Sequence, residues 1–343
     1  MTIIKIKIEE LSSLILDVLV NTDIPLKDAQ IVRDLLMFAE LRKNNQGLIK
    51  LVTGALKPSL KYNNQDIELE FETQVSAKIN GNYHIGMAVV SKAVDIALKK
   101  ASNIGICIVT ASKYNSATGA LGYWVRKIVN DNKIGIVCSN CPEMVAPFGS
   151  YERIFGTNPI AIGIPNESDK NPVVIDMATS AEAYYHLKTK ETLGEDISND
   201  IAYGPDGYPT TSPTEALKGA LRVFDRSHKG SGLSLCIELL AGALSGASME
   251  DKWNSDNWGS LVIVIDPKIF GPISDDFTKR VSTMCDRVKN AKPLPTSFSS
   301  SSSTSSEIFL PGEKGDQIHD ETIKSGLIEL DDNIYKKLLE MKA

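Results

Sequence analysis

The stretch that decides the fold is FGTNPIAIGIPNESDKNPVVIDMATS, residues 155–180. It holds two short runs rich in isoleucine and valine, each introduced by Asn-Pro, with a polar turn between them. Short apolar runs bounded by turn residues are typical of buried strands. The same texture recurs in residues 105–112, 133–140 and 259–267, and helical patterns cover 119–130 and 231–244. We therefore expect an α/β fold whose sheet is covered on both faces.

The opening of the chain reads as helices. Apolar side chains recur with helical spacing over residues 9–20 and again over 27–42, so two helices are expected to pack as a pair. Residues 66–80 alternate apolar and acidic side chains, which predicts one half-exposed strand followed by a turn at Gly81 and Asn82. Two further helices are expected, over about 87–102 and over 332–341.

Composition limits the possible partners. Of the 343 residues, 42% are hydrophobic and 23% charged, as in an ordinary globular protein. No apolar run approaches the roughly 18 residues that a membrane helix needs. The net charge is -6 and the basic residues are dispersed, so we expect neither a membrane nor a nucleic acid as partner. The start, MTIIKIKIEE, lacks the pattern of a signal peptide, so a cytoplasmic location is expected.

Five cysteines occur, mostly inside apolar runs, so buried reduced thiols are the expectation, although two of the five form a C-x-x-C pair. This pair, Cys138 and Cys141, permits a redox or zinc half-site, or simply a strand that runs into a turn. The four histidines are scattered and no second cysteine pair completes a ligand set, so we predict no metal site.

The usual catalytic fingerprints are missing. No G-x-x-x-x-G-K-[ST] or G-x-S-x-G occurs, which argues against a nucleoside-triphosphate loop and a serine hydrolase. The stretch HKGSGLSL has Leu235 where a G-x-G-x-x-G motif requires its third glycine, so an ordinary Rossmann turn is not supported either.

Turns rich in small residues follow the expected strand ends. Their order along the chain and their exact residues are informative. They are YNSATGALGYW (114–124), GTNPIAI (156–162), DMATS (176–180), KGSGL (229–233) with ELLAGALSGA after it, and PGEKG (311–315). Together these motifs resemble the malate/L-lactate dehydrogenase type 2 family over nearly the whole chain. The resemblance implies a non-Rossmann α/β fold with an N-terminal helical region and a mixed-sheet cofactor domain. It also implies a homodimer that uses NADH or NADPH.

The resemblance divides the chain into three segments. Residues 1–75 would form the helical, substrate-binding region, 76–270 the α/β cofactor-binding core, and 271–343 a C-terminal segment that packs back on the body. The last segment contains TSFSSSSSTSS, residues 296–306, which is too polar to pack and predicts a mobile surface loop.

The resemblance also implies a cofactor site. Small and hydroxyl residues at a strand end let backbone amides approach a pyrophosphate, and a cation suits a phosphate. The implied cofactor residues are Met177, Ala178, Thr179, Ser180, Lys229, Gly312 and Glu313, with Thr157 and Asn158 near the nicotinamide and substrate. Asp176 before them either titrates in the pocket or caps the following helix.

The positions that carry proton-transferring residues in the family have different residues in this chain. In the family, the first-helix motif reads Leu-Arg-Gly-x-x-Ser-His-Gly-x-x-Arg, whereas residues 41–50 here read LRKNNQGLIK. Gln46 therefore stands for the histidine that exchanges the substrate proton, and Lys50 for the arginine that grips a carboxylate. A second family histidine aligns with Ala117. Arg42 keeps a substrate-binding role by the same resemblance.

Gln46, Lys50 and Asp176 are thus the catalytic candidates. An amide can hydrogen-bond a carbonyl but cannot give it a proton, and a lysine lacks the two-pronged fork that suits a carboxylate. Gln46 is a catalytic replacement, a binding group or a relic. His186 is a possible compensating acid.

Two hypotheses follow. The first is an NAD(P)H-dependent reductase of a small molecule, an imine or a 2-oxo acid derivative, since an iminium is already an electrophile. The second is a family member that has lost hydride transfer and binds a metabolite or nucleotide, or catalyses a non-redox reaction.

Overall fold

The structure is a computed structural model that describes residues 3–22, 24–56, 59–294 and 307–342. The serine-rich stretch 296–306, predicted to be a mobile loop, lies outside the described residues. No helix in the described ranges is long and apolar enough to cross a membrane.

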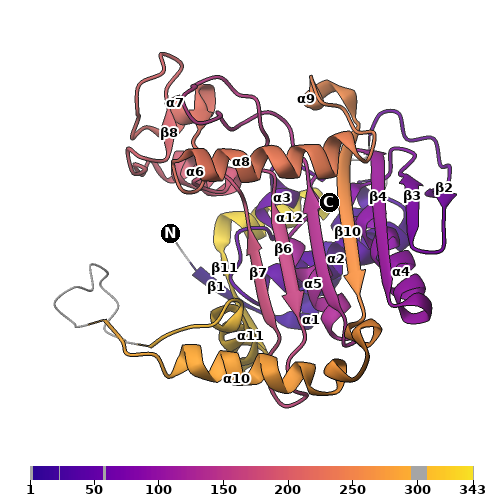
Figure 1. Cartoon of the computed structure of the whole chain (residues 1–343). Helices are drawn as coiled ribbons and strands as arrows, with labels where there is room; N and C mark the ends of the chain where they lie inside the picture. Colours follow the sequence, from indigo (N-terminus) through magenta and orange to yellow (C-terminus); the bar gives the residue numbers. More distant parts are fainter. Residues whose placement is uncertain (1–2, 23, 57–58, 295–306, 343) are drawn as a thin grey trace.

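A seven-stranded mixed sheet forms the centre of the molecule (Figure 1), in the order β2-β3-β4-β10-β5-β6-β7. Its strands are β2 (Glu68–Glu72), β3 (Ser76–Asn80), β4 (Ile106–Tyr114), β10 (Trp258–Ile265), β5 (Ile134–Ser139), β6 (Ile160–Ile164) and β7 (Val173–Met177). Only β3 and β4 pair in parallel. The α/β class and the mixed sheet expected from the sequence are therefore confirmed.

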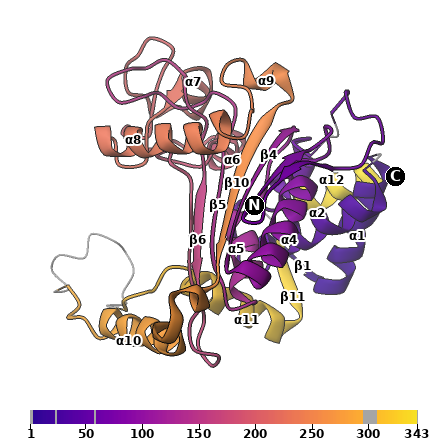
Figure 2. The same cartoon turned by 45° about the vertical axis from the view of Figure 1, so that its right-hand side comes forward.

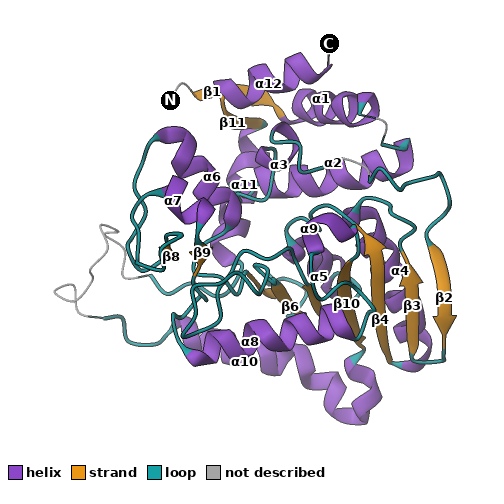
Figure 3. Cartoon of the chain, turned by 90° about the horizontal axis from the view of Figure 1, so that it is seen from above, coloured by secondary structure: helices purple, strands orange, loops and turns teal. Residues whose placement is uncertain are grey.

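Helices cover one face of this sheet. α4 (Gly86–Ile104) packs on β4, and α5 (Leu121–Val129) packs on β5, β6 and β7. Outside them lie the paired helices α1 (Ile8–Asn21) and α2 (Leu26–Glu40), joined by α12 (Asp332–Lys342), as Figure 2 shows. β1 (Ile3–Lys7) and β11 (Leu327–Asp331) pair antiparallel and bring the two ends of the chain together (Figure 3). The predicted pair of N-terminal helices is thus present.

The other face is only partly covered, which corrects the expectation of a sheet buried on both sides. α8 (His228–Ile237) and the π-helical segment η1 (Glu238–Ala243) cross one end of it, and α10 (Phe277–Lys289) lies at the other (Figure 1). Between them five isoleucines stand directly opposite one another on neighbouring strands: Ile108, Ile263, Ile136, Ile162 and Ile175. The two outer members are 38% and 39% exposed. The apolar pattern indicated this face correctly, but no helix or strand in the described part of the chain covers the middle of it.

Two further expectations were wrong. Residues 66–80 form two antiparallel strands, β2 and β3, because the Thr73 hydroxyl accepts hydrogen bonds from the Val75 and Ser76 N–H groups and turns the chain. Cys236, expected to be buried, is exposed, because it lies on the outer side of α8.

The remaining elements surround these layers. They are α3 (Ile49–Val52), α6 (Tyr184–Leu193), β8 (Ala202–Tyr203), α7 (Pro213–Lys218), β9 (Ala220–Leu221), α9 (Lys252–Ser255), the 3-10 helical η2 (Pro267–Asp276) and α11 (Glu313–Ser325). The large hydrophobic core contains residues from β1 to α12, with Tyr114 and Trp124 among its largest side chains. The three-segment division of the chain remains a prediction.

Candidate functional site

A cavity of about 960 Å³ opens where the chain leaves β5 and β7 and enters α5. Gln46, Lys50, Ala117 and Asp176 all line it, although they come from three separate parts of the sequence. Thr157 also lines it. The residues that the resemblance singled out for chemistry therefore meet in one place, and the volume is typical of small-molecule sites.

Asp176 is placed by β7 and held by α5. The Gly122 N–H, in the first turn of α5, donates a hydrogen bond of 2.8 Å to its Oδ2 atom. Asp176 is exposed by its surface area, and that surface lies in the cavity, whose walls enclose the carboxyl. This surrounding raises the pKa of Asp176 to about 6, against the lowering effects of the Gly122 hydrogen bond and the Lys50 charge. The acid therefore anchors to α5 instead of capping a helix after it.

Lys50 is the buried cation of the cavity. It belongs to the short helix α3, it is 4% exposed, and its Nζ lies 4.3 Å from the centroid of the Tyr185 ring. Burial lowers the pKa of Lys50 to about 8, while the charges of Cys141 and Asp176 act in the opposite direction. The cavity thus holds an acid and a base that both titrate close to neutral pH, an arrangement that is common at catalytic sites.

Gln46 lies in the turn that leads to α3. Its N–H donates to Asn44 Oδ1 and its side-chain Nε2 to Asn45 Oδ1, each at 2.9 Å. The turn is tied down by Glu40, whose Oε1 accepts a hydrogen bond of 2.7 Å from the Leu48 N–H. Burial raises the pKa of Glu40 to about 7. Glu40 thus orients the segment that carries both candidates, and sequence reasoning missed it.

A polar network supports the wall behind the cavity. Asn158 Nδ2 donates to Glu238 Oε2 at 2.7 Å, and the Asn158 Oδ1 accepts from the Cys141 N–H at 3.1 Å. Glu238 in turn forms an ion pair with Lys252. Thr179 donates to the Asn158 carbonyl at 3.0 Å, so both predicted site residues lie behind the cavity surface. The only sequence signal for this network was a glutamate inside the apolar run LCIELL.

Main-chain groups of the cavity suit a nucleotide. Met177, Ala178 and Ser180 line it, as do Gly119 and Ala120 just before α5. Small side chains at a strand end and at the start of a helix allow a phosphate to approach backbone N–H groups. The donor set therefore fits a dinucleotide.

Four predicted residues lie elsewhere. Lys229 is exposed in the first turn of α8, Gly312 packs against the Val174 carbonyl, and Glu313 pairs with Lys289 at 2.7 Å. Arg42 lines a second cavity. Their assigned roles remain predictions.

The histidine and cysteine alternatives are placed as well. His186 Nδ1 lies 2.9 Å from Glu182 Oε1, and His186 is not among the residues that line the cavity. Cys138 and Cys141 are free thiols where β5 runs into a turn, and only Cys141 reaches the cavity. Within the described ranges no three histidine, cysteine or acidic side chains converge as a metal site.

Comparison with known proteins gives a consistent result. A family model described as malate/L-lactate dehydrogenase matches residues 6–339. An L-sulfolactate dehydrogenase from Methanothermobacter thermautotrophicus is 33% identical over 98% of this chain and 95% of that protein. A Delta(1)-pyrroline-2-carboxylate reductase from Ancylobacter novellus is 46% identical over 37% of this chain and 39% of that protein. The solved sulfolactate dehydrogenase from Methanocaldococcus jannaschii superposes with a TM-score of 0.79 at 31% identity, covering 98% of this chain and 96% of the other.

Proposed function

Because this chain belongs to the malate/L-lactate dehydrogenase family, we propose that it is an NAD(P)H-dependent reductase of a small imine or 2-oxo acid. The observation that carries this proposal is the meeting of Gln46, Lys50 and Asp176 in one cavity. The relatives are dehydrogenases and a reductase by name, which supports hydride transfer as the reaction class.

We assign the cofactor, NADH or NADPH, to the side of the cavity made by Met177, Ala178 and Ser180. A reduced nicotinamide supplies a hydride when bound. The main-chain N–H groups before α5, near Gly119 and Ala120, would hold its pyrophosphate. The choice between the two nicotinamides and the cytoplasmic location expected from the sequence remain predictions.

Lys50 supplies the positive charge and the proton in this proposal. Its ammonium group is desolvated, so it attracts a substrate carboxylate or a developing alkoxide more strongly than an exposed lysine does. A pKa of about 8 keeps it protonated at neutral pH and still able to release a proton. Asp176 offsets this charge, and Gln46 donates a hydrogen bond from its amide without exchanging a proton.

An imine is the favoured substrate class. A protonated imine needs no further acid, which suits a cavity whose lining in the described chain contains no imidazole. The partial match to a pyrroline-carboxylate reductase supports this choice. The second candidate function is binding of a nucleotide or metabolite without turnover, or a non-redox reaction. Gln46 and Ala117 favour it, because neither side chain can transfer a proton at neutral pH.

We also propose that two copies associate through the partly covered face of the sheet. The row of five isoleucines lies on the sheet face on which η1 packs against β10 and β5, and on η1 Leu239 is 48% and Leu240 45% exposed. Exposed apolar surface marks association sites, and a twofold pair is the commonest homo-oligomer. The partner is therefore expected to be a second copy of this chain.

Cofactor titration followed by turnover tests the proposal. We expect NADPH or NADH fluorescence to change on titration, and cyclic imines and 2-oxo acids to be reduced at a rate that falls above about pH 8, as Lys50 loses its proton. Lys50→Met should abolish turnover but retain cofactor binding, whereas Lys50→Arg should keep binding and lose the pH dependence. Cofactor binding without turnover on any of these substrates would favour the second candidate. No binding of either nicotinamide would refute the reductase assignment.

A further inference from the structure

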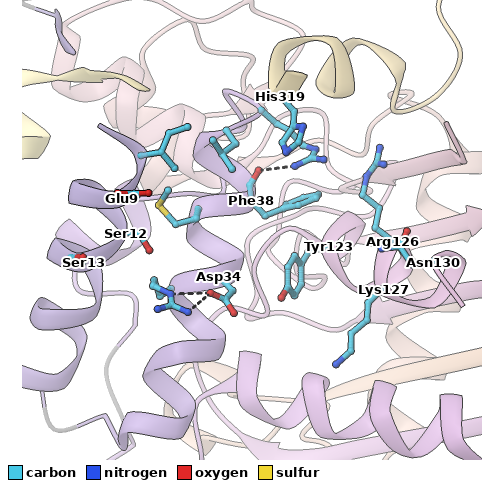
Figure 4. Close-up of a pocket in the computed structure, with 15 residues that line it drawn as sticks. Glu9, Ser12, Ser13, Asp34, Phe38, Tyr123, Arg126, Lys127, Asn130 and His319 are labelled. Carbon is cyan, nitrogen blue, oxygen red and sulfur yellow. Dashed lines mark hydrogen bonds and ion pairs between the residues drawn. The ribbon is translucent and has the colours of Figure 1, made fainter. Parts of the chain in front are cut away.

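A second cavity, of about 940 Å³, lies on the helical side of the molecule, away from the proposed reductase site. Side chains from α1, α2, α5 and α11 line it, together with Leu41 and Arg42 just after α2. Figure 4 shows His319 and Arg126 at one end beside Phe38, with Tyr123 in the middle and Ser12 on the opposite wall. The cavity thus has a basic end and an aromatic floor.

Three charged groups meet at the basic end, a buried carboxylate and two largely buried guanidinium groups. Arg126 Nη2 lies 2.8 Å from Asp316 Oδ2, and Arg42 Nη2 lies 3.4 Å from Asp316 Oδ1. The three side chains are 15%, 14% and 6% exposed. Two guanidinium groups therefore share one carboxylate in a region of reduced solvent screening, which leaves one positive charge without a buried counter-ion.

Arg42 shows the consequence of this imbalance. Its Nε atom is buried and has no hydrogen-bond partner among the residues that the structure describes. Burial and the charge of Arg126 lower the pKa of Arg42 to about 10, in spite of Asp316. An orphaned buried donor of this kind costs free energy, so the protein's own acceptors leave the guanidinium incompletely satisfied. The arginine also stacks on Phe38, with 4.0 Å between its Cζ and the ring centroid.

The other charges around the cavity are already paired and exposed to solvent. Arg33 binds Asp34 at 2.6 Å, Lys127 binds Asp95 at 2.6 Å, and His319 lies 2.9 Å from Asp320. Solvent and salt screen such pairs, so they contribute little to the field at the buried end. Glu9, on the far wall, is exposed.

We propose that this second cavity is a binding site for a small organic anion, in which Arg42 and Arg126 hold a carboxylate or phosphate group and Phe38 and Tyr123 contact an apolar or aromatic body. A guanidinium group can donate two parallel hydrogen bonds to two oxygen atoms of either a carboxylate or a phosphate. The stacked Arg42 is preorganised for the contact, because its ring partner already fixes the side chain. The site is independent of the reductase chemistry.

Calorimetric titration with three probes tests the proposal: inorganic phosphate, benzoate and phenyl phosphate. We expect phenyl phosphate or benzoate to bind more tightly than inorganic phosphate, because only they reach the aromatic floor. Which of the two binds better tells a phosphate ligand from a carboxylate ligand. The Lys50→Met variant locates the site: binding retained in this variant belongs to the second cavity, and binding lost belongs to the reductase cavity and overturns the proposal.

Two variants of the buried ion cluster should have opposite effects on affinity. Asp316→Asn removes the competing carboxylate and should tighten binding about tenfold, whereas Arg126→Gln removes a charged donor and should weaken it about tenfold. A merely structural cluster predicts that both variants lose stability and that neither changes anion affinity in this opposed manner. Lys127→Gln, at the exposed rim, is the matched control and should change affinity less than about twofold.

A variant that leaves the ion cluster intact covers the case in which these two do not fold. Ser12→Phe places a ring in the cavity from the opposite wall and should block benzoate and phenyl phosphate. The proposal is overturned if none of the three probes binds at about 10 mM, or if Ser12→Phe and Asp316→Asn leave binding unchanged.

Discussion

Lys252 Nζ lies 2.8 Å from Glu238 Oε1 in the interior, where the lysine side chain has no exposed surface and the glutamate side chain is 5% exposed. Glu238 also accepts hydrogen bonds from Asn140 at 3.2 Å and from Asn158 at 2.7 Å. This ion pair therefore joins α9 and η1 to the two turns that form the back wall of the proposed reductase site. Loss of this ion pair should therefore lower the stability of the fold and disturb the back wall of the cavity.

Lys252→Met should lower the free energy of unfolding by about 3–5 kcal/mol, because it leaves Glu238 charged and buried without its cation. Urea denaturation measures this. Lys61→Met is the control, since Lys61 is half exposed and lies 3.8 Å from Asp256, and should cost less than about 1 kcal/mol. Equal losses of unfolding free energy in the two variants would contradict the conclusion that Lys252 neutralises a buried charge.

Lys50 should make stability rise with pH in the alkaline range. Its pKa is about 8 in the folded chain and 10.5 in the unfolded reference, so the unfolded state binds more protons between these values. The cost of burying the charge is complete below pH 8 and is relieved as pH rises toward 10.5. Relative to Lys50→Met, the wild type should gain about 2–3 kcal/mol over this window. Urea denaturation of both proteins at pH 7.5 and at pH 10 measures this gain. The same change in unfolding free energy with pH for the wild type and Lys50→Met would argue against a buried charged lysine.

Gln46→His should raise kcat/KM for a simple 2-oxo acid by about 10²- to 10⁴-fold, the range of general acid–base catalysis. The reason is that an imidazole can give the substrate oxygen the proton that the amide withholds. Asn45→His, a neighbouring position that also lines the cavity, is the matched control and should change the rate little. An equal response of both variants would mean that residue 46 has no special position toward the substrate.

Gly119 should tolerate no side chain. Its φ is +77° and an added Cβ would lie 2.2 Å from Leu35 Cδ2, so Gly119→Ala combines backbone strain with overpacking, about 2–5 kcal/mol in total. Gly149 has a φ of +87° but open space around it, so Gly149→Ala should cost only about 1–2 kcal/mol. Chemical denaturation of both variants compares the cost of backbone strain alone, at Gly149, with the cost of strain plus overpacking, at Gly119. A larger cost at Gly149 would refute the packing argument at the entrance of α5.

The proposed dimer should dissociate when charge enters its apolar face. Leu239→Glu places a carboxylate on an exposed position of η1, and the variant should elute and scatter light as a monomer under conditions in which the wild type is expected to behave as a dimer. Leu60→Glu changes an equally apolar residue that is fully exposed in the loop between α3 and β2, and it should leave the assembly intact. A dimeric Leu239→Glu protein would place the interface elsewhere.

Much of the fold was visible in local patterns. The β-branched runs around residues 158–165 and 171–180 became β6 and β7, and the helical spacing of residues 9–20 and 27–42 became α1 and α2, within one or two residues at most ends. Side-chain periodicity reports which face of an element is apolar, and that information lies entirely within a few neighbouring residues. The turn motifs likewise indicated the family, and the match to the family model agrees with that prediction.

Only the tertiary structure decided which surfaces meet. β10 inserts between β4 and β5 although more than a hundred residues separate it from either, and no local pattern specifies such a neighbour. For the same reason no local pattern shows that the motif DMATS is divided, with Asp176 facing the cavity while Thr179 lies behind its wall. The exposed Cys236, the Glu238–Lys252 pair and the Arg42–Asp316–Arg126 cluster depend on contacts between distant elements. Sequence determined the elements and their apolar faces, because these are short-range properties; burial and charge pairing were decided by the packed chain, because they depend on what each face finally contacts.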